Sequence, residues 1–129
     1  MIDISKYTSF FHDGSINDII NKDNNIILIM ESAQIDEEDL KEPIPLTKDQ
    51  RINGKLHIEN IKSISVNKIL TKKIEKILDD GEIMDFEIDN NHIFISFLWD
   101  NYPRKPKINE YHGYDIEAEK IWWENTPDE

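Results

Sequence analysis

Isoleucine supplies about half of the apolar side chains, and this feature constrains the fold more than any other. Of the 49 hydrophobic residues, 24 are isoleucine, whereas two are alanine and one is valine. β-Branched side chains have few χ1 rotamers and pack well on the pleated surface of a sheet. A core built mainly from them favours strands over helices.

Length and charge indicate one acidic domain. The chain has 129 residues, a usual size for a single hydrophobic core, so residues 1–129 are expected to form one domain. It carries 27 acidic and 15 basic residues, a formal net charge of -12. This balance repels nucleic acid and anionic membranes, and the basic clusters at 68–76 and 104–107 are too small to reverse it. The expected partner is therefore another protein, and a basic one.

Three further features bear on location and chemistry. No apolar run approaches the roughly 20 residues that span a bilayer. The N-terminus lacks the charged and apolar regions of a secretory signal. Cysteine is absent, which removes disulfides, thiolate nucleophiles and Cys-ligated zinc. We expect a cytoplasmic protein that does not associate with membranes.

The first half of the chain predicts a hairpin followed by a surface excursion. Residues 15–22 and 26–32 favour strands, and the Asp-Asn-Asn sequence at 23–25 suits the tight turn between them. Residues 34–50 are rich in acids and contain two prolines, which do not fit a central strand. We expect an excursion there with one helical turn.

Residues 67–80 have the pattern of an amphipathic helix. Apolar residues recur there at spacings of three and four, so they would share one face. Gly81 follows in the position of a C-cap glycine. The apolar residues of this predicted helix are Leu70, Ile74, Ile77 and Leu78.

The rest of the chain predicts strands. Residues 51–66 alternate with a break near Glu59 and Asn60, and 82–89, 92–99 and 114–124 alternate as well. The run 92–99 is apolar on both faces, which is typical of a central strand. Met84, Phe86 and Ile88 are expected on one face, and 101–107 is expected to be a loop. The fold class predicted is α+β, a mostly antiparallel sheet of about six strands with one amphipathic helix.

His12 and Asp13 form the most suggestive polar pair. They precede the first strand, and an imidazole beside a carboxylate can transfer protons, so a small-molecule binding or hydrolytic domain is one hypothesis. The alternative is structural: Asp13 and Gly14 make a turn, while His12 bonds to the backbone.

Other catalytic patterns are missing. His57, His92 and His112 have no metal-ligand spacing, no glycine pattern suits a phosphate loop, and no serine stands in a nucleophile elbow. We therefore expect no metal and no cofactor, and the sequence favours a non-catalytic role.

The acidic residues gather in the predicted strands of the second half. Residues 82–100 contain no lysine or arginine. If two of these strands share a sheet face, their carboxylates form one surface for a basic protein, to which residues 36–39 can add. The alternative is an ordinary hydrated sheet face. The residues assigned to partner binding are Asp85, Glu87, Asp89, Asp115, Glu117, Glu119 and Trp123.

The two adjacent tryptophans, Trp122 and Trp123, point to opposite faces of a strand. One belongs in the core, and the other is an interface anchor, since tryptophan is enriched at interface hot spots. Burial of both is the simpler alternative.

A short motif resembles a known group of proteins. The stretch Phe10–Ile16, which leads into a hairpin that ends at Ile29–Ala33, looks like the opening of a group of small bacterial proteins with a Phe-His-Asp-small motif. Some of these resemble immunity proteins of polymorphic toxin systems, and the closing Ile121–Glu124 is similar too. The resemblance implies a cytosolic α+β protein that binds and neutralises a toxin without catalysis.

Overall fold

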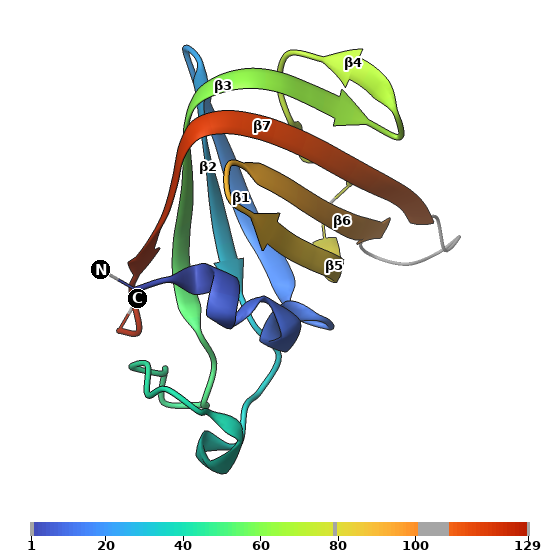
Figure 1. Ribbon diagram of the computed structural model, residues 1–129. Helices are drawn as coiled ribbons and strands as arrows, with labels where there is room; N and C mark the ends of the chain where they lie inside the picture. The colour runs from blue at the N-terminus through green and yellow to red at the C-terminus, as the bar shows by residue number, and fades with distance from the viewer. Residues whose placement is uncertain (1, 79, 101–108, 129) are drawn as a thin grey trace.

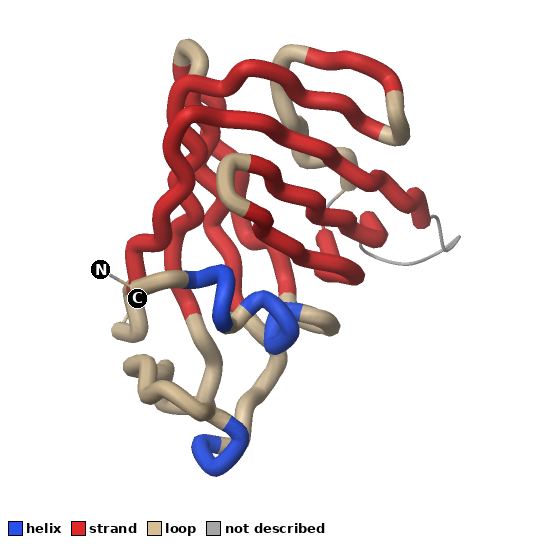
Figure 2. Tube along the Cα trace, in the orientation of Figure 1, coloured by secondary structure: helices blue, strands red, loops and turns tan. Residues whose placement is uncertain are grey.

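The computed structural model describes residues 2–78, 80–100 and 109–128. Within these residues, seven antiparallel strands form one sheet, and the helical turns are short 3-10 helices (Figures 1 and 2). The helical turns are η1 (Ile4–Lys6), η2 (Thr8–Phe11) and η3 (Glu37–Asp39). The strands are β1 (Ser15–Lys22), β2 (Asn25–Glu31), β3 (Asn53–Val66), β4 (Ile69–Thr71), β5 (Asp80–Asp89), β6 (His92–Asp100) and β7 (Asn109–Asn125).

The sheet closes on itself. Its strand order is β2-β1-β5-β6-β7-β3-β4, and β2 also pairs with β3, so every strand except β4 belongs to a ring. The junction between β1 and β5 is short, because only Ser15 and Ile16 pair there, with Glu82 and Gly81. Closure of the ring leaves an inner face for the core and an outer face for solvent.

The long strands β3 and β7 bend sharply (Figure 1). They pair with each other on both sides of the bend, and β3 also pairs with β2 before it. The bend in β3 lies at Asn60, which has a φ of 53°, and the register with β7 shifts between Ile61 and Ser63. Asparagine tolerates this left-handed conformation better than most residues. The break predicted near Glu59 and Asn60 is therefore confirmed.

The core fills the inside of the ring and is largely made of isoleucine. η1 and η2 lie at one end of the ring (Figure 1), where Phe11 is fully buried. The Phe11 ring meets Phe86 of β5 edge-on at 5.2 Å and Trp123 of β7 at 5.6 Å, as ring centroid distances. These aromatic contacts attach the N-terminal segment to two strands that are distant in sequence.

The α+β prediction is wrong, because the segment predicted as a helix contains a strand and an irregular stretch. Asn67 and Lys68 both have positive φ and form a tight turn, after which β4 pairs back onto β3. Ile69 and Leu70 are 72% and 80% exposed, so the expected apolar face does not form. The structure is almost entirely antiparallel sheet, and residue 79, within the predicted helix, lies outside the described residues.

Residues 72–78 pack against β1 instead of forming a helix. The Asn21 side chain donates to the Ile74 carbonyl at 2.7 Å and accepts from the Ile74 N–H at 3.2 Å. Ile74 is fully buried, and Ile77 and Leu78 pack partly against the core. Asn21 thus provides hydrogen-bond partners for the N–H and the carbonyl of Ile74, which would bond within the helix if one formed.

Gly81 lies inside β5 and does not cap a helix. A Cβ atom at Gly81 would lie 2.4 Å from Ile16 Cγ2 and 2.7 Å from the Trp99 ring, so close packing excludes a side chain. The expected grouping of Met84 with Phe86 and Ile88 also fails, because a bulge between Ile83 and Asp85 turns Met84 away from the inner face.

Several other predictions are confirmed. β1 and β2 form the first hairpin, and η3 is the helical turn of the excursion at 34–50. β6 lies between β5 and β7 and carries apolar residues on both faces. The loop predicted at 101–107 lies outside the described residues.

Candidate functional site

The outer side of β5, β6 and β7 carries four rows of side chains across the three strands. Directly paired residues of antiparallel strands point to the same side of a sheet. The register therefore places Phe94 between Glu87 and Asp115, and Leu98 between Glu82 and Tyr111. In the other two rows, His92 lies between Asp89 and Glu117, and Ser96 lies between Asp85 and Gly113.

This surface, called the acidic face below, has an apolar centre and carboxylates on both sides. Its centre is the β6 strip of Phe94 and Leu98, extended by Tyr111, which is 51% exposed. β5, β6 and the part of β7 up to Glu119 contain no lysine or arginine. The carboxylates of the face are Glu82, Asp85, Glu87, Asp89, Asp115 and Glu117.

Local contacts fix several side chains of the acidic face. His92 Nε2 lies 3.1 Å from Asp115 Oδ1, and the Ser96 hydroxyl donates to Asp85 Oδ2 at 2.9 Å. A Cβ atom at Gly113 would lie 3.4 Å from the Phe94 ring, at ordinary van der Waals distance, so this ring lies against β7. The face therefore presents side chains in defined positions.

The structure brings most of the predicted partner-binding residues together. Asp85, Glu87 and Asp89 of β5 lie on the same outer side as Asp115 and Glu117 of β7. Glu119 lies beyond them and accepts a hydrogen bond from the Asn60 side chain at 3.2 Å. η3, with the acids at 36–39, lies apart from β5, β6 and β7, at the lower end of the view in Figure 1.

The two tryptophans do point to opposite sides, but Trp123 is the inner one. Trp123 is 3% exposed and pairs with the buried Leu56. The outer tryptophan is Trp122, which stacks on His57 with ring centroids 3.9 Å apart and planes 6° from parallel. Its Nε1–H donates to Glu59.

Sequence reasoning missed the apolar centre of the acidic face. Phe94 and Leu98 alternate with inward-facing residues of β6, and this alternation was the signal available in the sequence. The alternation indicates that both sides of β6 carry apolar residues. A strand that is buried on both sides gives the same pattern, so the sequence does not show which case applies. Only the closed sheet shows that the second side faces outward.

His12 and Asp13 adopt a turn geometry. His12 Nδ1 donates to the Met84 carbonyl at 2.6 Å, and its Nε2 lies 3.6 Å from Asp13 Oδ1. Both side chains are more than half exposed. The carbonyl of Met84, and secondly the Asp13 carboxylate, raise the pKa of His12 above its ordinary value. Asp13 has a φ of 68°, and Gly14 N–H closes the turn onto the Phe11 carbonyl.

The four histidines have separate surroundings. His57 Nε2 donates to Glu124 at 2.9 Å, and His112 lies beside Tyr114 with ring centroids 6.2 Å apart. His92 pairs with Asp115 and His12 with Met84. The geometry does not join any two histidines into a site.

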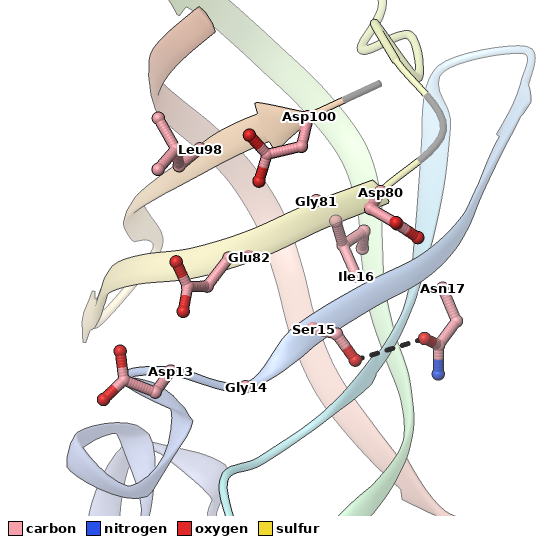
Figure 3. Close-up of a pocket in the computed structure, with 10 residues that line it drawn as sticks. All are labelled: Asp13, Gly14, Ser15, Ile16, Asn17, Asp80, Gly81, Glu82, Leu98 and Asp100. Atoms are coloured by element: carbon pink, nitrogen blue, oxygen red, sulfur yellow. Dashed lines mark hydrogen bonds between the residues drawn. The ribbon is translucent and has the colours of Figure 1, made fainter. Parts of the chain in front are cut away.

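A cavity of about 420 Å³ lies where β1 diverges from β5, beside the acidic face (Figure 3). Leu98 and Glu82 belong to both the cavity and the face. Figure 3 shows the Asp13 and Glu82 carboxylates on one side and Asp80 on the other. His12 is not part of the lining, so the cavity does not combine an imidazole with these acids.

Residues 2–78, 80–100 and 109–128 contain neither a metal-binding cluster nor a membrane-spanning helix. Histidine and acidic side chains nowhere gather there in a group of three or more suited to a metal ion. None of the helices in these ranges is long and apolar enough to cross a membrane.

Comparison of the chain with protein-family models, with curated proteins and with solved structures finds no match. The acidic face is consequently the feature on which a functional proposal rests.

Proposed function

We propose that the chain is a non-catalytic protein-binding domain whose acidic face binds a basic partner. The observation that carries the proposal is the position of Phe94 between Glu87 and Asp115 on the outer side of the sheet. An apolar centre with a charged rim is the usual anatomy of a protein interface. Aromatic residues at such a centre supply much of the binding energy.

The charge of the face supports a basic partner. Six carboxylates lie there without a lysine or arginine among the same strand segments, and the whole chain has a net charge of -12. A field of one sign accelerates association with a protein of opposite charge and disfavours acidic competitors. Binding is therefore expected to weaken as the salt concentration rises.

The finer form of the proposal concerns the kind of partner. The resemblance of Phe10–Ile16 to proteins similar to immunity proteins suggests a toxin, bound and neutralised in the cytoplasm. Non-catalytic neutralisation needs only a stable complex that covers the toxin, and an acidic face suits a toxin with a basic surface.

Affinity capture with matched variants tests the proposal. The wild type is compared with Glu87→Lys and Phe94→Ala, and with Glu37→Lys as an acid reversed outside the face. We expect wild type and Glu37→Lys to retain a basic protein that both face variants lose. A higher salt concentration should release this protein from the wild type. Equal retention by all four proteins would refute the role of the face.

A further inference from the structure

A second cavity lies at the end of the acidic face, between the N-terminal turn, the β5–β6 turn and β7. Its volume is about 530 Å³. Ile4 and Ile88 form part of its wall, together with Trp122 of β7. Asp89 belongs both to this cavity and to the acidic face, so the two surfaces are continuous.

The apolar wall of the cavity is held in place. Trp122 stacks on His57 and donates to Glu59, which fixes the orientation of the indole. Ile4 is 4% exposed and so belongs to the core as well as to the cavity. Lys120 Nζ lies 6.0 Å from the centre of the Trp122 ring but is not part of the lining.

The rim of the cavity is negative. Asp3 and Asp89 are both exposed, and the lining contains no basic side chain. Asp3 Oδ1 accepts from the Ser5 N–H at 3.1 Å and from the Ser5 hydroxyl at 2.5 Å. The hydroxyl bond lowers the pKa of Asp3, so its carboxylate stays ionised at neutral pH.

We propose that this cavity receives an arginine side chain of the basic partner, with its methylene groups against Ile88 and Trp122 and its guanidinium between Asp3 and Asp89. This inference rests on the proposed function, because the basic partner that supplies the arginine is part of that proposal. An arginine combines an apolar stem with a charged planar head that binds carboxylates, which matches the wall and the rim.

Titration with a small probe tests the cavity without the partner. Nα-acetyl-arginine amide is added to the full-length chain while the indole N–H signals of the tryptophans are followed by NMR. We expect a saturable shift of the Trp122 signal, while the buried Trp99 and Trp123 serve as internal references. The citrulline analogue has the same shape without the charge and should bind about fivefold more weakly. Equal binding of both probes, or an unmoved Trp122 signal, would overturn the proposal.

Capture of the partner by Asp3→Asn separates this inference from the proposed function. Asn can still cap the N-terminal turn, and Asp3 is not part of the acidic face. We expect about fivefold weaker capture by Asp3→Asn, and unchanged capture by Asp18→Asn, another exposed acid. If Asp3→Asn captures normally while Glu87→Lys does not, the cavity inference fails and the proposed function stands. If Glu87→Lys captures normally, the proposed function fails.

Discussion

Asn21 of β1 bonds to the backbone of Ile74 in both directions, at 2.7 Å as donor and 3.2 Å as acceptor. This exchange holds the stretch 72–78 against the sheet. Replacing Asn21 with alanine leaves two partly buried backbone groups without partners, which should cost about 1–3 kcal/mol of unfolding free energy. Urea denaturation measures the change, and Lys22→Ala is the neighbouring control. A loss no larger than that of the control would contradict the role of Asn21.

Ile74 and Leu70 provide a direct test of whether this segment is irregular, as in the structure, or helical. They are four residues apart and would lie on one face of a helix, but Ile74 is fully buried and Leu70 is 80% exposed. Ile74→Ala should cost about 2–5 kcal/mol, and Leu70→Ala under about 0.5 kcal/mol. Similar losses in thermal or urea unfolding would favour the helix.

The two phenylalanines of the β5–β6 hairpin should separate stability from binding. Phe86 is 6% exposed in the core, so Phe86→Ala should cost about 3–5 kcal/mol. Phe94 lies half-buried on the acidic face, so Phe94→Ala should lose roughly half as much stability but most of the partner binding. Denaturation and binding assays on both variants check this. A Phe94→Ala protein that binds normally would be inconsistent with the proposed interface.

The ionisation of His12 should follow its local contacts. Its pKa is raised first by the Met84 carbonyl and then by Asp13, so the imidazole should titrate above its ordinary value of 6.5. Because the folded pKa exceeds the unfolded one, the contribution to stability is complete below the unfolded pKa and disappears as pH rises through the folded pKa. NMR titration measures this, and Asp13→Asn should lower the pKa only in part. A folded pKa at or below 6.5 would contradict the geometry.

The strands of the fold could largely be predicted from the sequence, because period-two alternation and turn residues are local signals. The error at 67–80 arose because the spacing of Leu70 and Ile74 fits a helix, while the forces that prevent one are not local. The carbonyl and N–H of Ile74 are paired by Asn21, which is 53 residues away. Gly81 similarly looked like a cap, although its role depends on Trp99 and Ile16 across neighbouring strands.

The acidic half of the candidate site could be predicted, and its apolar half could not. The acids of β5 and β7 form an alternating pattern in the sequence. The structure adds that they lie on the same side of the sheet. The sequence does not identify Phe94 as a surface residue, because a strand with apolar residues on both sides can be buried on both sides. Trp122 and Trp123 could not be assigned to inside and outside, because the buried positions of β7 change phase between Ala118 and Trp123. The change lies opposite Asn60 of β3, so alternation along β7 alone does not reveal it.

Carboxyl footprinting of the complex tests the central claim most directly. Exposed carboxylates are coupled to an amine by carbodiimide in the free chain and in the chain with its captured partner, and the labelled positions are quantified by mass spectrometry. We predict that the partner protects Glu87, Asp89 and Glu117, while Glu37 and Glu38 of η3 are labelled equally in both states. Unchanged labelling of the acidic face, with protection at η3 or elsewhere, would contradict the account.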